Sequence, residues 1–413
     1  MSQVCIVGGG LAGLSCAGVL QANGVPFRLL EASDGLGGRV RTDKQEGYLL
    51  DRGFQIVQTA YPELERQLDS KRLRLHRFMP GALVRYKGRF HRFVDPTRAP
   101  KEIFSLLRSP LGSRRDKMHM PVLKRKVTRG SLSELFDRQE STTLEYLQNE
   151  GFSNQFIDHF FRPFFSGVFF ESKLTTTSRM FEFVFRVLSQ GDGALPEEGI
   201  GALSQELARR IPEEAVSLNA RVDRLDGEGV LLESGERIGC RAVVLATDAQ
   251  QASRFLGDST EVPYVSSLCL SYAADRTPVK EPILVLNGEG AGPITNLCVP
   301  SQVASSYAPK GKAQVVVTVV EQREKAASVE PAVRDQLREW FGRGVDSWRL
   351  LRAWPIEKAL PDLKPPTNHP ERQAVRRSKG IYVCGEYGSL SSFQWAMHSG
   401  RRAGEAVIED LAG

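Results

Sequence analysis

Residues 4–13, near the start of the sequence, read Val-Cys-Ile-Val-Gly-Gly-Gly-Leu-Ala-Gly. Residues 3–7 predict a buried parallel strand, because a short β-rich run ends directly at three glycines. The next apolar residues recur at helical spacing from Leu11 until Asn23-Gly24, and residues 27–30 predict a second strand that closes at Glu31. The expected unit is therefore β-α-β, with the right-handed crossover that such units adopt.

The glycines of this turn have separate physical roles. Gly8 permits the tight turn, Gly10 lets the backbone approach a pyrophosphate, and Gly13 allows the helix to pack closely on the strand. The helix directs its free N–H groups at the phosphates, and the carboxylate of Glu31 can accept both ribose hydroxyl protons. A purely structural glycine turn would not need a preceding strand, a following helix and an acid at the end of the second strand. We therefore predict a dinucleotide site. Its expected contacts are Gly8, Gly10, Leu11, Ala12, Gly13, Glu31 and Ala32.

Several further segments accompany this unit. They are Gly37-Gly38-Arg39-Val40-Arg41-Thr42, Asp51-Arg52-Gly53-Phe54-Gln55, Tyr382-Val383-Cys384-Gly385-Glu386-Tyr387 and Ser391-Ser392-Phe393-Gln394-Trp395-Ala396. Together with the glycine turn they resemble the flavin-containing amine oxidase superfamily, in particular its protoporphyrinogen oxidase and phytoene or squalene desaturase branches. The resemblance involves both ends of the chain, and it implies FAD as the dinucleotide.

The resemblance also implies a role for each segment. An arginine between glycines suits a diphosphate, because it is a fixed cation where backbone N–H groups can come close. For Val222 a core position in a strand is an equally good interpretation, as it is for Trp354 beside Ala359-Leu360-Pro361. The implied contacts are Gly37, Gly38 and Arg39 at the diphosphate, Gly53, Phe54 and Gln55 at the isoalloxazine, Val222 at the adenine, Gly385 and Glu386 at the ribityl phosphate, and Phe393, Gln394 and Ala396 at the pyrimidine edge.

The length of 413 residues predicts two domains, since one domain typically holds about 100–200 residues. We expect an α/β fold with a Rossmann-type FAD-binding domain that is discontinuous in sequence, formed by residues 1–65, 190–255 and 355–413. Residues 66–189 and 256–354 are expected to form a substrate-binding α+β domain of antiparallel sheet and helices. Within it, the region between Arg98 and Asp192 is rich in phenylalanine and helical in its periodicity.

Composition restricts the other classes of function. The net charge of +6 is modest, but basic residues are concentrated between Lys71 and Arg129. This stretch is either a solvated face or a peripheral contact with anionic lipid, and without a recognisable module it does not indicate nucleic-acid binding. The six cysteines form no C-x-x-C pair and predict reduced core residues rather than a metal site. With no leader-like segment and no apolar run of about 20 residues, we expect a cytoplasmic location, with any membrane contact peripheral.

The reaction is less sharply indicated, because a flavin abstracts hydride itself and requires no particular side-chain acid or base. Amine oxidases of the superfamily usually carry a lysine beside the flavin and a tyrosine in the last motif, whereas residues 266–272 contain no lysine and Ser392 takes the tyrosine position. We therefore expect oxidation or desaturation of a large apolar or conjugated substrate, such as an isoprenoid or a tetrapyrrole. Alternatives are an amine or amino-acid oxidase and a flavin-binding protein without turnover.

Three residues are candidates for contact with this substrate. Phe165 belongs to the phenylalanine-rich run, which is either a channel lining or an aromatic core. Arg162 lies in the same run and needs an acidic partner, which is either a substrate carboxylate or an acid of the protein. Trp395 replaces a residue that is usually glycine, and it would reshape the pocket over the flavin. The sequence does not identify a catalytic side chain or an oligomeric state.

Overall fold

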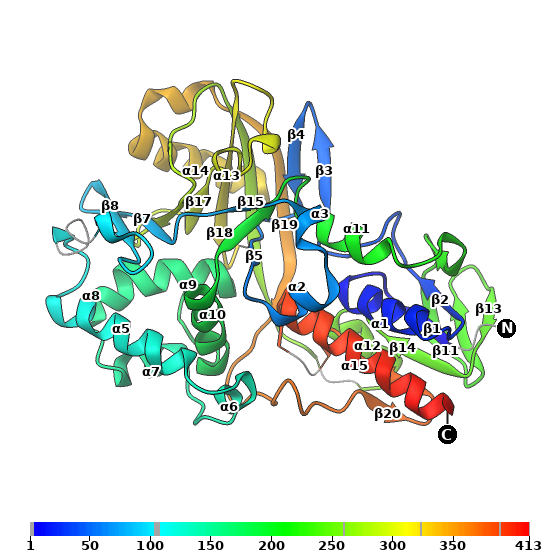
Figure 1. The fold of residues 1–413 in the computed structure, drawn as a ribbon. Coiled ribbons are helices and arrows are strands. Elements are labelled where there is room, and N and C mark those ends of the chain that lie inside the picture. The colour runs from blue at the N-terminus through cyan, green and yellow to red at the C-terminus, as the bar shows by residue number, and fades with distance from the viewer. Residues whose placement is uncertain (1–3, 103–107, 259–260, 323, 388–389, 413) are drawn as a thin grey trace.

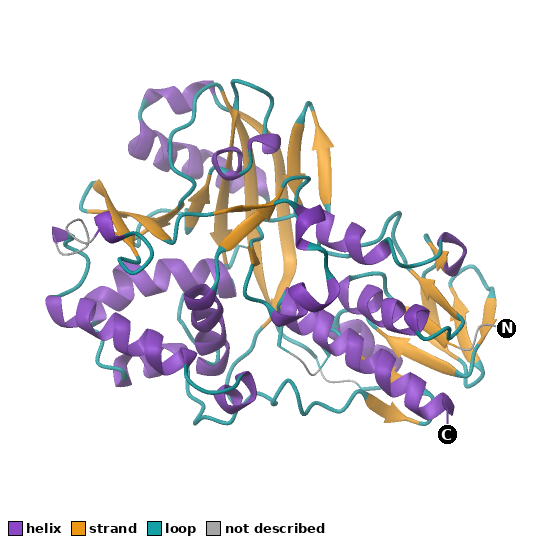
Figure 2. Cartoon of the chain, viewed as in Figure 1, coloured by secondary structure: helices purple, strands orange, loops and turns teal. Residues whose placement is uncertain are grey.

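The computed structural model describes residues 4–102, 108–258, 261–322, 324–387 and 390–412. A six-stranded and a seven-stranded sheet organise these residues, and helices pack around both (Figure 2). The predicted α/β class is confirmed. Within the described ranges, no helix combines the length and apolar character needed to cross a bilayer.

The six-stranded sheet has the order β10-β2-β1-β14-β21-β20 and is parallel except for its last strand, β20. Its centre is the predicted first strand, where Val4, Cys5 and Ile6 are fully buried. A strand covered on both faces must be apolar throughout, which explains the unbroken run in the sequence. The strands are β1 (Val4–Val7), β2 (Phe27–Leu30), β10 (Val216–Ser217), β14 (Ala242–Leu245), β20 (Arg376–Ser378) and β21 (Ile381–Val383).

Two helices from opposite ends of the chain lie side by side on this sheet. Figure 1 shows α15 (Phe393–Ala412, red) alongside α1 (Leu11–Ala22, blue). The contact depends on Gly400, because a Cβ at this position would lie 2.0 Å from the carbonyl oxygen of Ala12. Helix α11 (Ala202–Ala208) packs against α1, and α12 (Ala249–Phe255) follows β14 in the chain.

Two predicted elements are interrupted. The sequence pattern of residues 216–225 predicts one strand, but β10 ends at Ser217 and Asn219 adopts a left-handed φ of 53°, so that the chain enters a separate antiparallel sheet. The periodicity of residues 59–73 predicts one helix, but Leu68, whose backbone is extended, divides it. The elements are β11 (Val222–Leu225), β12 (Gly229–Leu232), β13 (Arg237–Gly239), α2 (Pro62–Gln67) and α3 (Ser70–Leu73).

Two small sheets connect these elements to the rest of the molecule. One is a hairpin and the other has the order β5-β9-β6. Their strands are β3 (Thr42–Gln45), β4 (Tyr48–Asp51), β5 (Val57–Gln58), β6 (Leu75–Arg77) and β9 (Gly193–Pro196).

The seven-stranded sheet has the order β19-β15-β18-β17-β16-β7-β8 and is antiparallel except between β16 and β7. Strand β19 could not be predicted from its local pattern, because it contains Pro355 and several charged residues. As the edge strand it pairs on one side only, so these residues are tolerated. The strands are β7 (Gly81–Tyr86), β8 (Arg89–Val94), β15 (Tyr264–Ala274), β16 (Leu284–Asn287), β17 (Asn296–Cys298), β18 (Ala313–Val320) and β19 (Arg349–Pro361), with helices α13 (Pro300–Val303) and α14 (Ala326–Phe341).

A group of helices lies beneath this sheet in Figure 1. Capping boxes at Ser113, Ser131 and Thr142 begin three of them. The helices are α5 (Arg114–Thr128), α6 (Leu132–Phe136), α7 (Thr143–Asn149), α8 (Asn154–Phe156), α9 (Arg162–Phe169) and α10 (Ser178–Gln190). The predicted domain boundaries stay a prediction, although all strands of the six-stranded sheet lie in the three segments assigned to the FAD-binding domain.

Candidate functional site

A continuous cavity of about 1270 Å³ extends from the glycine turn after β1 to the phenylalanine-rich helices α9 and α10. Pockets for a single small ligand commonly measure about 300–1,000 Å³, so this cavity has room for a dinucleotide and a second molecule. Eighteen of the residues predicted from the sequence line it, namely Gly8, Gly10, Leu11, Ala12, Glu31, Ala32, Gly37, Gly38, Arg39, Gly53, Phe54, Gln55, Phe165, Val222, Gly385, Glu386, Phe393 and Ala396.

The glycine turn is shaped to receive a ligand at the N-terminus of α1. Gly8 has a φ of 110° and donates its N–H to the carbonyl of Leu30 at 2.8 Å. Gly10 precedes the helix without a side-chain cap, and a Cβ on it would meet no protein atom within 4 Å. Gly13 does not line the cavity, because it lies behind the turn, where a Cβ would come 1.9 Å from the oxygen of Gly8. The turn therefore leaves open space where phosphate oxygens can approach backbone N–H groups.

Glu31 is held beside this turn by the end of β2. Its carboxylate accepts the N–H of Gly9 at 2.7 Å and both the N–H and the hydroxyl of Ser33, at 2.8 and 2.7 Å. These bonds orient a carboxylate on a residue that is only 9% exposed. Its remaining lone pairs suit the hydroxyl groups of a ribose.

The glycine-arginine loop folds over the same turn. The N–H of Gly37 donates to the carbonyl of Gly9 at 2.8 Å, and Gly38 has a left-handed φ of 57°. Arg39 donates to the carbonyl of Ala359 at 2.9 Å and forms an ion pair with Glu386. A guanidinium and a buried carboxylate from opposite ends of the chain thus meet at the cavity wall.

The edge strand β19 forms another wall. Ile356, Lys358, Ala359 and Leu360 of this strand line the cavity. The side chain of Ile356 also explains Gly53, where a Cβ would come 2.6 Å from the Ile356 Cδ1 atom. Lys358 was not identified from the sequence; its Nζ lies 3.9 Å from Oδ1 of Asp248, which also lines the cavity.

The first turn of α15 divides the residues of the last motif between two faces. Phe393 and Ala396 line the cavity, whereas Gln394 accepts the N–H of Glu63 at 2.9 Å on the far side of the helix. Trp395 does not line the cavity either, since it is fully buried against Phe136 and Phe183. Successive helical residues differ by about 100° in direction, so one motif serves both the cavity and the core.

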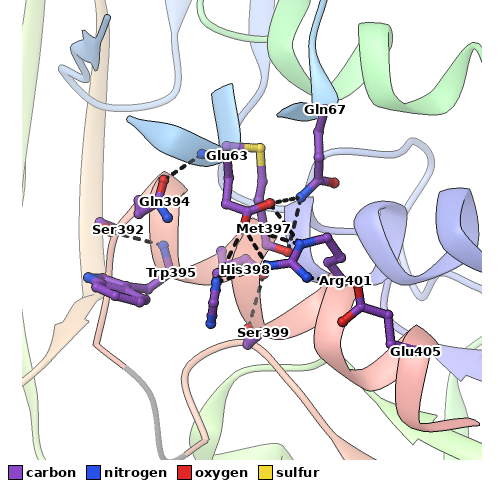
Figure 3. A network of polar contacts seen from close by, with 11 residues as sticks. Glu63, Gln67, Ser392, Gln394, Trp395, Met397, His398, Ser399, Arg401 and Glu405 are labelled. Carbon is purple, nitrogen blue, oxygen red and sulfur yellow. Dashed lines mark hydrogen bonds and ion pairs between the residues drawn. The ribbon is translucent and has the colours of Figure 1, made fainter. Parts of the chain in front are cut away.

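A buried polar network fixes α15 to α2 (Figure 3). Glu63 accepts hydrogen bonds from Gln67 at 2.6 Å and from Arg401 at 2.8 Å, and its Oε1 lies 3.2 Å from His398 Nδ1. Burial opposes ionisation of Glu63, but the bonds from His398, Arg401 and Gln67 outweigh it and lower its pKa to about 2. The network thereby holds the helix that presents Phe393 and Ala396 to the cavity.

The far end of the cavity is mostly apolar and is lined by side chains that include Phe164, Phe165 and Phe185. Arg162 does not line it, since its guanidinium pairs with Asp158 at 2.9 Å and donates to the carbonyl of Ser172 at 2.7 Å. The acidic partner that the sequence requires is thus found on the same helical segment. Asn296 and Gln58 line this cavity but were not identified from the sequence.

Residues 11–408 match the family described as flavin containing amine oxidoreductase. Protoporphyrinogen oxidase 2 of Arabidopsis thaliana is 27% identical over 166 residues, which are 40% of this chain and 32% of that protein. The aligned part thus spans about a third of this curated relative.

Two solved structures have the same fold. A protein from Exiguobacterium sp. 255-15, provisionally assigned as a protoporphyrinogen oxidase, aligns with a TM-score of 0.74 at 17% identity over 99% of both chains. Putrescine oxidase bound to putrescine aligns with a TM-score of 0.72 at 16% identity, also over 99% of both chains. At such identities the likeness concerns the fold alone.

The family match extends over nearly the whole chain. The open turn at Gly10, the oriented carboxylate of Glu31 and the cation at Arg39 are what a flavin dinucleotide needs from its site. The predicted resemblance, the cofactor FAD and the oxidoreductase class are confirmed at the level of the family. The chain therefore belongs to the flavin-containing amine oxidoreductase family.

Proposed function

We propose that this protein is an FAD-dependent oxidoreductase that removes hydride from a large apolar or conjugated substrate, of the isoprenoid or tetrapyrrole class. The observation that carries the proposal is the continuity of the cavity. One space of about 1270 Å³ joins the dinucleotide turn to a chamber lined by phenylalanine side chains. A substrate in that chamber would be in direct contact with the cofactor.

The cofactor supplies the hydride-accepting ring, and the protein supplies its position and surroundings. In this proposal Gly8, Gly10 and Arg39 hold the diphosphate and Glu31 holds the ribose. Gly53, Phe54 and Gln55 bound the ring, and Gln55 is itself fixed by donating to the carbonyl of Arg39 at 3.0 Å.

The remaining cofactor contacts come from distant parts of the chain. Val222 bounds the adenine end, and Gly385 with Glu386 bounds the ribityl phosphate. Gly13 and Gln394 act through packing instead, because neither lines the cavity. Phe393 and Ala396 face the ring at the start of α15, where helix N–H groups favour negative charge.

Amine oxidation receives less support from the same cavity. Strand β15 contains no lysine, and Ser392 caps α15 by accepting the N–H of Trp395 at 3.2 Å.

Anaerobic reduction of the holoenzyme tests the proposal. The visible absorbance of the bound flavin is expected to bleach with a porphyrinogen or with a polyene precursor in detergent, and not with small primary amines. Phe165→Ala should slow bleaching by widening the chamber, whereas Phe341→Ala, outside the cavity lining, serves as the control. Bleaching by putrescine or an amino acid, but by no apolar compound, would contradict the proposal.

We further propose a peripheral contact with anionic membranes through α5. Arg114, Met118, Val122 and Arg125 follow one another at helical spacing along its exposed face, and Met118 and Val122 are 66% and 63% exposed. Apolar side chains between cations suit the boundary between anionic head groups and acyl chains. Arg125 and Pro121 also line the cavity, so an apolar substrate could enter there from a bilayer.

Flotation with liposomes tests this contact. The protein should float with anionic phosphatidylserine vesicles at low salt and should remain at the bottom with purely zwitterionic vesicles. Replacing Met118 and Val122 together by serine should abolish flotation. Leu218→Ser, at the exposed leucine outside α5, should not. If the double serine variant floated as well as the wild type, α5 would not be the membrane-contacting surface.

A further inference from the structure

Lys358 is the last charged residue of the edge strand β19, and it lines the cavity. Its ammonium group donates no hydrogen bond to any described residue, and the carboxylate beside it, Asp248, lies at the long distance of 3.9 Å. Its other contact is the ring of Tyr264, whose centroid lies 5.4 Å from Nζ. A lysine ammonium has three N–H donors, so all three can be directed to a ligand in the cavity.

A second cation meets the same stretch of β19. Arg39 donates to the carbonyl oxygen of Ala359 at 2.9 Å, and Ala359 directly follows Lys358. The guanidinium of Arg39 is paired with Glu386, whose side chain is only 8% exposed. Tyr264 connects the two cations, because its hydroxyl donates to Glu386 at 3.2 Å while its ring contacts Lys358. Lys358 therefore lies close to the arginine predicted to hold a diphosphate.

The acid beside Lys358 relates it to the N-terminus of α1. Asp248 follows Thr247, whose carbonyl oxygen would lie 3.5 Å from a Cβ on Gly385. The same Cβ would lie 3.7 Å from the Cβ of Ala12, in the first turn of α1. All of these residues line the cavity, as Lys358 does. An anion at the N-terminus of α1 would thus share this part of the cavity with the lysine.

The charges in this part of the cavity favour a further cation for such an anion. Three carboxylates line it, namely those of Glu31, Asp248 and Glu386. A diphosphate adds more negative charge, and Arg39 shares its positive charge with Glu386. The ammonium of Lys358 can offset this excess, because its contact with Asp248 is long and its stem is flexible.

We infer that Lys358 is a second cation for the diphosphate of FAD, which its ammonium group binds from β19 while Arg39 and the N–H groups of α1 bind it from the other side. The inference rests on the cofactor site of the proposed function and adds a residue that belongs to no local motif. A hydrogen bond between an ammonium and a phosphate oxygen is charge-assisted and therefore stronger than the contact with Asp248. FAD would then be held from both large sheets, since β19 belongs to the seven-stranded sheet.

Calorimetric titration of the flavin-free chain with FAD tests the residue without any substrate. Lys358→Met keeps the apolar stem and removes the charge, so the dissociation constant of FAD should rise about tenfold. Lys358→Arg keeps the charge and should bind FAD more tightly than Lys358→Met. The matched control is Lys364→Met, because Lys364 is 58% exposed against 54% for Lys358, pairs with Asp362 and does not line the cavity. Its dissociation constant should equal that of the wild type.

Asp248→Asn separates a contact with FAD from an ion pair that merely supports the fold. Asp248 caps α12 by accepting the N–H of Gln251 at 2.9 Å, and asparagine is an equally good cap. If Lys358 only neutralised Asp248, Asp248→Asn and Lys358→Met would weaken FAD binding alike. Because we place Lys358 at the diphosphate, Asp248→Asn should bind FAD at least as tightly as the wild type, since a competing carboxylate is removed.

Three results would overturn the inference. They are wild-type affinity in Lys358→Met, no advantage of Lys358→Arg over Lys358→Met, and equal losses in Lys358→Met and Asp248→Asn. None of them would bear on the proposed hydride transfer, which is measured by bleaching of the loaded protein. Failure of every apolar compound to bleach the flavin would instead contradict the proposed function, and it would leave the dissociation constants of FAD unchanged.

Discussion

Glu63 and Arg401 form a buried ion pair between α2 and α15, with Oε1 and Nη2 2.8 Å apart and the glutamate side chain only 3% exposed. The two residues are 338 positions apart in the sequence. Because α15 presents Phe393 and Ala396 to the cavity, this pair connects the stability of the fold to the geometry of the proposed cofactor site. It also makes Glu63 a carboxylate whose ionisation stabilises the folded state.

Glu63→Gln is expected to remove an acid-sensitive part of the stability. The folded pKa of about 2 lies below the ordinary value of 4.5, so the stabilisation is present above pH 4.5 and is lost as the pH falls toward 2. The expected loss in the variant at neutral pH is about 3 kcal/mol, by about 1.4 kcal/mol per pKa unit. Urea unfolding at pH 7 and pH 3 measures it.

The matched control is Glu65→Gln, at an exposed residue two positions further along the same helix. It should change the free energy of unfolding by less than about 0.5 kcal/mol. If both variants lost the same stability, the network would have no special role.

Asp51 is expected to produce the opposite pH dependence. Burial raises its pKa to about 6 even though Thr42, Ile200 and Tyr307 donate hydrogen bonds to the carboxylate. Its stabilisation is therefore complete below the ordinary value of 3.8 and is lost as the pH rises through about 6. Asp51→Asn, which is neutral at every pH, should remove up to about 3 kcal/mol of this pH dependence.

Chemical unfolding between pH 4 and pH 7.5 measures the effect of Asp51. Asp43→Asn is the control, because it removes a carboxylate from the same hairpin without touching the Asp51 site. If the free energy of unfolding of Asp51→Asn varied with pH as it does in the wild type, the Asp51 carboxyl group would not titrate between pH 4 and pH 7.5.

Gly10→Ala should weaken FAD binding while leaving the protein folded. A Cβ at Gly10 meets no protein atom within 4 Å and instead enters the space proposed for the diphosphate. We expect the affinity for FAD to fall by at least about tenfold, because backbone N–H groups can no longer approach the phosphates. Flavin absorbance after gel filtration and the thermal midpoint of the apoprotein report the two properties.

Two glycines on α1 provide contrasting controls. Gly18 also has nothing within 4 Å, and Gly18→Ala should bind FAD normally with a gain of up to about 1 kcal/mol in helix stability. Gly13→Ala should instead destabilise the fold by about 1–3 kcal/mol, since its Cβ would overlap the oxygen of Gly8. Full FAD retention by Gly10→Ala would place the diphosphate elsewhere.

Arg162→Leu should have little effect on substrate binding. Its guanidinium pairs with the half-exposed Asp158 and with the carbonyl of Ser172, and it does not line the cavity. We expect a loss of about 1 kcal/mol or less in stability and an unchanged concentration dependence of flavin reduction. A tenfold rise in the substrate concentration that gives half-maximal flavin reduction would instead identify Arg162 as a substrate contact.

Local patterns predicted the β-α-β unit and the residues that line the end of the cavity proposed for the cofactor. The turn from Gly8 to Gly13 and the acid Glu31 could be found because their function depends on short spacings between a strand, a turn and a helix. The pattern failed at β19, where an edge position tolerates Pro355 and charges, and at Asn219, where one left-handed residue ends a strand.

The direction of each side chain required the tertiary structure. Phe393 and Ala396 face the cavity while Trp395 faces the core, because the close contact between Gly400 and Ala12 sets the rotation of α15. Asn296 and Lys358 reach the same cavity from strands about 60 residues apart, and neither belongs to a local motif. The sequence by itself determined the fold class and the dinucleotide turn, since both follow from neighbouring residues. Which residues line the end of the cavity proposed for the substrate was determined only by the tertiary structure, because packing brings distant strands and helices around one space.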